Sequence, residues 1–191
     1  VGSCYAGPVE DGARAVRALR QFGTPLLDLV GPTLYVNQQS VLDDTVPHGL
    51  HYYWKATNLT RLSDEVIDIV ADHACAATSP RSYSAMFHFG GAVARVPRDA
   101  TAYPGRDADH NIIIDAAWLP EEDDTVGAAE TAWTRAFLDA LQPHRAGVYV
   151  NFLDADDDAS RVREAYGDDT YRRLAEVKAK YDPENVFHNN N

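Results

Sequence analysis

The stretch NIIIDAAWL at residues 111–119 is rich in apolar residues with single polar ones among them, and it predicts a β-strand. In a strand, alternate side chains point to opposite faces. Asn111, Ile113, Asp115 and Ala117 therefore share one face, to which they bring one amide and one carboxylate.

Three further stretches predict strands around this one. Residues 51–59 (HYYWKATNL) are rich in aromatic residues, and residues 82–96 form a longer stretch interrupted by Gly90 and Gly91. Paired glycines inside a strand suggest a bulge or a bend. Residues 147–153 (GVYVNFL) predict the last strand.

Helices are expected between and after these strands. Ser63 is a suitable N-cap for a helix with Asp64 and Glu65 in its first turn. Asp123 or Asp124 would cap another. The remaining helices are expected near residues 8–22, 160–166 and 170–181, with a loop and one helical turn near residues 38–42 between the first helix and the first strand.

Residues 50–153 therefore follow the order strand, helix, strand, strand, helix, strand. This order is typical of the ferredoxin-like βαββαβ pattern, and it predicts an α+β fold. In such a fold an antiparallel sheet carries its helices on one face. The other face is left free to cover something else.

The composition limits the function classes. Of 191 residues, 45% are hydrophobic and 24% charged, as in an ordinary globular protein. The excess of 29 acidic over 17 basic residues gives a formal charge of -12, which argues against a nucleic-acid partner. No apolar run is long enough to span a membrane. The chain opens without Met and ends in asparagines, and we expect it to be part of a longer protein.

Motifs for metals and nucleotides are missing. Cys4 and Cys75 lie far apart and form neither a zinc signature nor a disulfide framework. The seven histidines show no spacing for a metal centre, so no metal is expected. The sequence also lacks a dinucleotide-binding GxGxxG, a P-loop and a GxSxG element.

Tyr149 and Asn151 are the first candidate site residues. Alternation in the last strand places this phenol and carboxamide together on the free face, opposite Val148, Val150 and Phe152. A strand tyrosine is more often a packing residue, so the spacing alone leaves both roles open.

His88 is the second candidate. It lies within the stretch 82–96 on the same face as Met86. A single histidine in a strand is more often structural than an acid or base, and both interpretations remain open at this point.

Segments along nearly the whole chain carry a resemblance to a known family. They are FGTPLLDLVGPTLYVNQQSVLD (22–43), HYYWKA (51–56), FHFGGAVARVP (87–97), NIIIDAAW (111–118), GVYVNFLD (147–154) and AYGDDTYRRLAEVKAKYDPENVFHNNN (165–191). In this order they resemble the C-terminal portion of bacterial FAD-linked oxidases of the berberine bridge enzyme-like family. The most specific pieces are Tyr149-Val150-Asn151 and the closing segment.

This resemblance implies a flavin-dependent oxidoreductase that dehydrogenates an alcohol, sugar or alkaloid-like substrate with hydride transfer to FAD. An N-terminal domain outside this chain would hold most of the FAD, so the chain alone is expected to bind none. Residues 1–147 would form the substrate-binding domain. Residues 148–191 would form a C-terminal module packed on the same sheet, and the partners would be a small-molecule substrate and the FAD-binding domain.

The resemblance also implies roles for single residues. Tyr149 matches a tyrosine that serves as the catalytic base or part of it, and His88 falls in a stretch that lines the pocket. Asn151, Asn190 and Asn191 are candidates for contact with the cofactor.

The sheet would supply the pocket. Its expected lining residues are Tyr53, Met86, Asn111 and Ile113.

An unperturbed phenol ionises only near pH 10, so a phenolic base needs a hydrogen-bonded partner, for which His88 and Tyr53 are candidates. Two positions of this chain differ from plant members of the family. Phe87 stands where those members carry a polar group, and Ile113 stands where they carry a glutamine.

Two other functions fit parts of the sequence. One is a non-catalytic ferredoxin-like module that binds a small ligand or forms a homodimer through its bare sheet face. The other is an intact metal-dependent oxygenase, which ranks last because the two-histidine, one-carboxylate set is missing.

Overall fold

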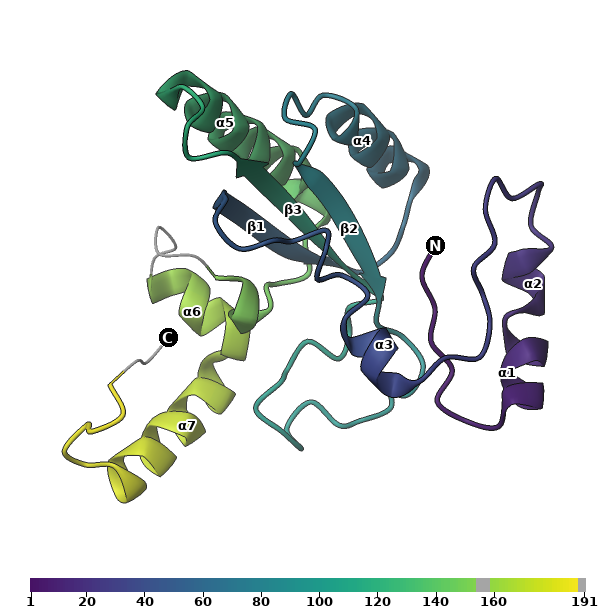
Figure 1. The fold of residues 1–191 in the computed structure, drawn as a ribbon. Helices are drawn as coiled ribbons and strands as arrows, with labels where there is room; N and C mark the ends of the chain where they lie inside the picture. The colour runs from purple at the N-terminus through teal and green to yellow at the C-terminus, as the bar shows by residue number, and fades with distance from the viewer. Residues whose placement is uncertain (154–158, 189–191) are drawn as a thin grey trace. The chain divides into compact units, whose positions relative to one another are not determined.

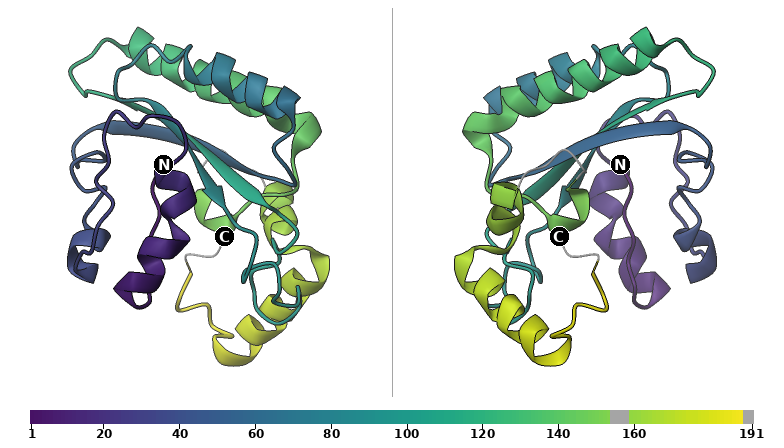
Figure 2. Two further views of the ribbon diagram at one scale, coloured as in Figure 1. Left: turned by 90° about the vertical axis from the view of Figure 1, so that its right-hand side faces the viewer. Right: turned by 90° about the vertical axis from the view of Figure 1, so that its left-hand side faces the viewer.

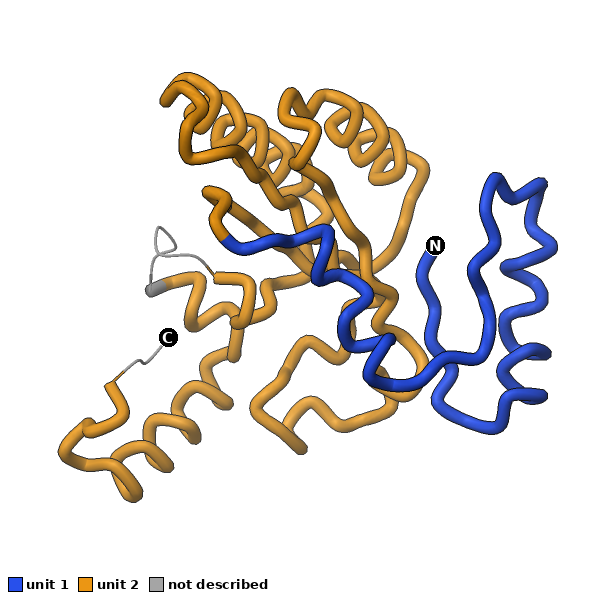
Figure 3. The backbone as a smooth tube through the Cα atoms, in the orientation of Figure 1, with its two compact units in different colours: residues 1–48 blue, residues 49–191 orange. Residues whose placement is uncertain are grey.

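The computed structural model describes residues 1–153 and 159–188, which fall into two compact units, residues 1–48 and residues 49–191 (Figure 3). No helix within the described ranges is both long and apolar enough to cross a membrane. The chain therefore has two parts that are each internally organised.

The first unit contains only short helices. They are α1 (Val9–Ala15), α2 (Arg17–Arg20) and α3 (Tyr35–Gln39). The helix predicted near residues 8–22 is confirmed with an interruption at Val16, and the helical turn predicted near residues 38–42 begins earlier, at Tyr35. None of the side chains in these three helices is buried.

The second unit is built on a three-stranded antiparallel sheet (Figure 1). Its strands are β1 (His51–Leu59), β2 (Tyr83–His88) and β3 (His110–Trp118). The order is β1-β3-β2, so β3 forms hydrogen bonds on both edges. The strands predicted at residues 51–59 and 111–119 are confirmed to within one residue.

Alternation along β3 gives the sheet two distinct faces. Ile112, Ile114 and Ala116 are buried on what we call the helix face, and Asn111, Ile113 and Asp115 lie on the opposite face, which we call the second face. The register extends both faces to the neighbouring strands, because directly paired residues project to the same side.

Two helices cover the helix face, as Figure 2 shows. They are α4 (Asp64–Ala74) and α5 (Asp124–Leu141). The predicted caps are confirmed: the Ser63 hydroxyl accepts a hydrogen bond from the Val66 amide, and the Asp123 carboxylate accepts one from the Thr125 amide. The α+β class is therefore confirmed, and α4 and α5 share one face of the sheet.

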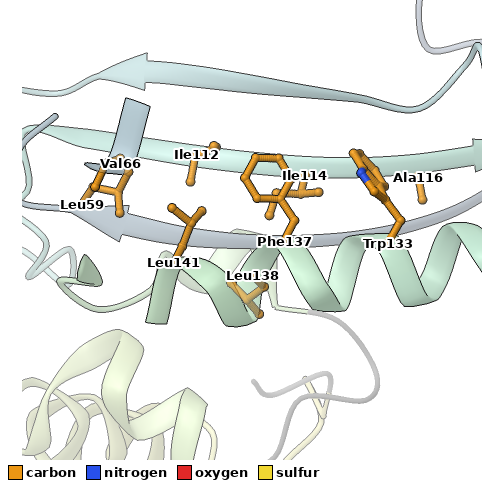
Figure 4. Close-up of a cluster of buried hydrophobic side chains, with 9 residues drawn as sticks. All are labelled: Leu59, Val66, Ile112, Ile114, Ala116, Trp133, Phe137, Leu138 and Leu141. Atoms are coloured by element: carbon orange, nitrogen blue, oxygen red, sulfur yellow. The ribbon is translucent and has the colours of Figure 1, made fainter. Parts of the chain in front are cut away.

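The hydrophobic core lies between these helices and the sheet (Figure 4). Its members are Leu59, Val66, Ile112, Ile114, Ala116, Trp133, Phe137, Leu138 and Leu141. Close approach of α5 depends on Gly127, since a Cβ atom there would lie 2.8 Å from the Trp118 ring. A larger residue at this position would push the helix away from β3.

The strand predicted at residues 147–153 is wrong. After α5 and the 3-10 turn η1 (Gln142–His144), the chain pairs with the end of β1 through a single bridge between Leu59 and Arg145. Gly147 then adopts a φ of 99°, and the chain continues into the 3-10 turn η2 (Val150–Phe152). The fourth strand of the ferredoxin-like order is thus reduced to a bridge, because the glycine turns the backbone away from β1.

The long strand predicted at residues 82–96 is also partly wrong. β2 ends at His88, before the paired glycines, and residues 89–109 form a loop. The Phe89 amide donates to the Asp109 carbonyl at 2.7 Å and closes this loop at its base. Gly91 has a φ of 62°, so the glycines end the strand and do not form a bulge within it.

Two further helices follow η2. They are α6 (Ala159–Tyr166) and α7 (Asp168–Tyr181), as predicted, and Gly167 with a φ of 72° separates them. Beyond α7 the Asp182 carboxylate accepts hydrogen bonds from the Val186 and Phe187 amides. These bonds hold the last described residues against the end of the helix.

One buried carboxylate joins α5 to the segment that leads into β2. Glu130 is fully buried, and it accepts hydrogen bonds from the Ser79 amide at 2.8 Å, the Thr78 amide at 3.2 Å and the hydroxyls of Thr78 and Ser82. Burial raises the pKa of Glu130, but these hydrogen bonds together outweigh it, and the net pKa lies below the usual range. The ionised form is therefore the one that this site stabilises.

Replacing Glu130 with Gln is expected to lower the free energy of unfolding by about 2 kcal/mol at neutral pH, since donors on the segment would lose a charged acceptor. A lowered folded-state pKa gives stability that is present above the unfolded pKa and is lost as pH falls through the folded pKa. The difference between wild type and variant should therefore shrink in acid. Urea unfolding across this pH range measures it, with the exposed Glu121→Gln as control. Equal stability of wild type and Glu130→Gln at neutral pH would contradict the role of Glu130.

Candidate functional site

Tyr149 and Asn151 lie together, although no strand holds them. Tyr149 immediately precedes η2, and the Asn151 side-chain amide donates a hydrogen bond to the Tyr149 hydroxyl oxygen at 2.8 Å. The predicted common sheet face is wrong, but the 3-10 turn brings the phenol and the carboxamide into contact. In Figure 2, η2 and α6 lie on the opposite side of the sheet from α4 and α5.

Two aromatic rings hold the Tyr149 ring. Tyr103 and Phe152 each meet it edge to face, with ring centroids 5.4 Å apart. The Arg106 guanidinium lies 4.8 Å from the Tyr103 ring centroid, and the Tyr103 hydroxyl donates to the Gly105 carbonyl at 3.1 Å. Burial raises the pKa of Tyr103 above its ordinary value, and nearby Arg106 opposes that shift.

Tyr103 was not identified from the sequence. It belongs to the loop 89–109, which has no regular structure and no periodicity that would point to a partner. The only available signal was the length of the loop, because loops this long in compact domains are often functional.

The structure does not place His88 beside Tyr149. His88 is the last residue of β2 and lies on the helix face, where its Nδ1 atom is 3.4 Å from Nε2 of His110. Burial lowers the pKa of His110, and the neighbouring His88 lowers it further. Within the described residues, the ring and hydrogen-bond partners of Tyr149 are Tyr103, Phe152 and Asn151.

The four predicted pocket residues are divided between the two faces of the sheet. Tyr53 and Met86 pack against the core on the helix face, where the Tyr53 hydroxyl accepts a hydrogen bond from Arg135 at 2.9 Å. Asn111 and Ile113 lie on the second face. The structure therefore brings only Asn111 and Ile113 to one surface, and it does not bring Tyr53 to Tyr149.

Asn111 is fully buried on the second face. Its side-chain amide donates to the Asn58 side-chain oxygen at 2.9 Å and to the Thr57 carbonyl at 3.3 Å. Its own Oδ1 atom has no partner among the described residues. The remaining candidates, Asn190 and Asn191, lie outside the described residues.

A row of three paired residues crosses the other end of the second face. Trp54, Asp115 and Tyr83 lie directly opposite one another on β1, β3 and β2. The Tyr83 hydroxyl is hydrogen-bonded to the Asp115 carboxylate, while Asp115 Oδ1 is buried without a partner in the described chain. Sequence reasoning had placed Asp115 on this face but had assigned it no role.

The electrostatics of this row follow from burial. Burial raises the pKa of Asp115, and the hydrogen bond from Tyr83 opposes part of that rise. Burial together with the Asp115 charge raises the pKa of Tyr83 to about 12. Tyr83 therefore stays a hydrogen-bond donor at neutral pH. Asp115 is its acceptor, and the burial of the Asp115 carboxylate lowers the stability of the fold.

No group of three or more His, Cys, Asp or Glu side chains in the described ranges could hold a metal ion.

Comparisons with known proteins are consistent with this arrangement. Residues 148–191 match the family model described as "Berberine and berberine like". An FAD-linked oxidoreductase of Dictyostelium discoideum is 29% identical over 100% of this chain and 41% of its own length. A glucooligosaccharide oxidase of Sarocladium strictum is 30% identical, with 78% of this chain and 33% of that protein covered.

Solved structures show the same fold. The berberine bridge enzyme from Eschscholzia californica has a TM-score of 0.61 at 21% identity, and the match covers 72% of this chain and 32% of that one. The chain thus spans less than half the length of these relatives. Sequence and structure comparisons agree on berberine bridge enzyme-like FAD-linked oxidoreductases, of which the matched region is a portion.

Replacing Asp115 with Asn is expected to stabilise the protein near pH 7 by up to about 1 kcal/mol, because it removes an unpaired buried charge and keeps an acceptor for Tyr83. A raised folded-state pKa means that the folded protein binds the proton more tightly than the unfolded chain. Wild-type stability therefore falls as pH rises from the unfolded pKa through the folded pKa. Urea unfolding of both proteins should show the advantage of Asp115→Asn growing over that interval. An advantage independent of pH would contradict this account.

Proposed function

We propose that this chain is the substrate-binding part of an FAD-linked oxidoreductase that dehydrogenates a hydroxyl-bearing substrate. Residues 1–147 would bind the substrate, and residues 148–191 would contribute the C-terminal module. The remaining length of such a protein, as in the relatives, would hold most of the FAD. The observation that carries the proposal is the hydrogen-bonded Tyr149–Asn151 pair inside the segment that matches the berberine-like family.

The residues of this chain would lie against one side of a flavin ring. The second face is not covered by α4 or α5 and carries the aromatic residues Trp54 and Phe87, which are among the exposed large hydrophobic side chains. Asn151 is exposed, so its amide can also contact a ring system placed against η2. FAD, when bound, would accept a hydride from the substrate carbon.

The role proposed for Tyr149 is to accept the substrate hydroxyl proton. To act as a base the phenol must first be ionised, and the hydrogen bond that Asn151 donates to its oxygen would favour this phenolate form. Tyr103 and Phe152 fix the ring by edge-to-face contact, which restricts the direction of the hydroxyl. The phenol is thus oriented from two sides and hydrogen-bonded by a neutral amide.

A non-catalytic ligand-binding or dimerisation module is the alternative. An FAD-linked oxidoreductase and a glucooligosaccharide oxidase are among the relatives with similarity along the chain, and this observation does not favour the alternative. The second face, on which the alternative was based, would serve an enzyme of this kind equally well as the surface that meets its substrate.

In the full-length protein, Tyr149→Phe is expected to slow flavin reduction by about 10²- to 10⁴-fold while KM changes little. Phenylalanine keeps the ring contacts with Tyr103 and Phe152 and deletes only the hydroxyl. Rapid-mixing measurement of flavin bleaching at saturating substrate is the direct test. The matched control is Tyr181→Phe, on an exposed tyrosine at the end of α7.

Bleaching of Tyr149→Phe within a few-fold of wild type would show that Tyr149 only lines the pocket. Failure to reconstitute any flavin with the full-length protein would reject the proposed function itself.

A further inference from the structure

Two histidines meet where the loop 89–109 leaves the sheet. His88 ends β2 and His110 begins β3, and the two residues are directly paired in the register. Nδ1 of His88 lies 3.4 Å from Nε2 of His110, and the ring centroids are 5.0 Å apart. The residues that follow and precede them, Phe89 and Asp109, form the hydrogen bond that closes the loop. The histidine pair therefore lies directly beside this closure.

A row of aromatic rings connects the histidine pair to Tyr149. Phe89, the residue after His88, meets the Tyr103 ring edge to face with the centroids 6.4 Å apart. Tyr103 in turn meets the Tyr149 ring edge to face at 5.4 Å. Side chains packed in contact can carry energetic coupling from one place in a protein to another. The position of Phe89 thus affects whether Tyr103 can support the Tyr149 ring.

The geometry of the pair suits two neutral imidazoles. Nδ1 of His110 is buried and has no partner among the described residues. An unpaired buried N–H is rarer than an unpaired acceptor, so the hydrogen-bond network assigns the proton of neutral His110 to Nε2, which donates to His88. A proton gained by His88 would force the His110 proton onto the buried Nδ1. A proton gained by His110 would go to the same atom, and in both cases Nδ1 becomes a buried donor without an acceptor.

The charges around His110 do not compensate for an added proton. Burial lowers the pKa of His110, the His88 ring lowers it further, and the Asp109 charge opposes only part of this shift. The residue paired with His110 on β1 is Leu59, which carries no charge. An unperturbed imidazole gains a proton near pH 6.5, so histidines released into water bind the proton more tightly than the closed pair does. Acid therefore favours the released state.

We propose that His88 and His110 are positioning residues for Tyr149. A proton gained by the pair opens the closure of the loop and withdraws Tyr103 from the Tyr149 ring. The role of Tyr149 as a base rests on the proposed oxidoreductase function, whereas the pH-dependent ring contact rests only on the residues of this chain. Gly90 also couples the loop to the pair, because a Cβ atom there would lie 3.2 Å from Nε2 of His88. Movement of the His88 ring thus reaches the loop directly.

The first test follows the Tyr149 ring in this chain by NMR, with isotope-labelled tyrosine and with Tyr149→Phe for assignment. Between about pH 7.5 and about pH 5, which spans the titration of an ordinary imidazole, the Tyr149 signals should move toward those of free tyrosine. A phenol does not titrate in this range, so the movement reports the lost ring contact and not ionisation. In His110→Asn, which has no imidazole at this position to protonate, the signals should stay in place.

Circular dichroism over the same range separates release of the loop from acid unfolding. The helix and sheet signal should stay constant while the ring signals move. His48→Asn, on an exposed histidine outside the sheet, is the matched control and should behave like wild type. Ring signals that do not move, that move equally in His110→Asn, or that move only together with loss of the helix signal would overturn the proposal. If His110→Asn does not fold, His88→Asn at the exposed end of β2 answers the same question.

The second test is the rate of flavin reduction in the full-length protein. Ionisation of Tyr149 changes this rate with pH in every variant, so the quantity to follow is the rate of His88→Asn divided by that of wild type. This ratio should rise about fivefold or more between about pH 7.5 and about pH 5, because only wild type loses the support of its Tyr149 ring. A ratio that stays constant while the ring signals move would overturn the positioning role.

The two tests also separate this proposal from the proposed function. Absence of flavin reduction in the wild-type protein would reject the oxidoreductase function. The NMR signals need no flavin, so they would still confirm or reject the release of Tyr103 on their own.

Discussion

The pairing of β3 with both of its neighbours is the constraint on which residues 49–188 depend. Because β3 is hydrogen-bonded on both edges, its alternation is imposed on β1 and β2 as well. This alternation packs three residues of β3 against α4 and α5, namely Ile112, Ile114 and Ala116. It places the residues between and beside them on the second face, namely Asn111, Ile113 and Asp115. A shift of one residue in this register would exchange core and site, so the hydrophobic packing that stabilises the fold also determines which polar groups are available for binding.

Two buried carboxylates differ in whether the fold stabilises their ionised form. Glu130 faces several donors, and its ionised form is favoured despite complete burial. Asp115 is nearly as buried but has one donor, so burial dominates and its pKa rises. The first carboxylate joins α5 to the chain before β2 and is explained by stability. The second gains nothing comparable from the fold, because burial acts against its charge and only Tyr83 donates to it.

The sequence predicted those elements whose signals are local. The strands β1 and β3, the caps Ser63 and Asp123, and the helices α6 and α7 follow from side-chain alternation and from capping chemistry. The stretch 147–153 shows the limit of this reasoning, since its alternation of apolar and polar residues fits a strand equally well. Whether it pairs with β1 depends on the φ of 99° at Gly147, which glycine permits but does not require. The contact between Tyr149 and Asn151 was expected, although it arises from a turn and not from a shared strand face.

The rest of the candidate site depends on contacts between residues distant in the chain. Tyr103 meets Tyr149 across 46 residues, and nothing in either local sequence indicates that contact. The unpartnered oxygen of Asp115 likewise becomes visible only when the register sets Tyr83 and Trp54 beside it. A phenol held by two rings and an amide has a fixed direction, and the contacts that fix this direction come from across the fold and not from the local sequence.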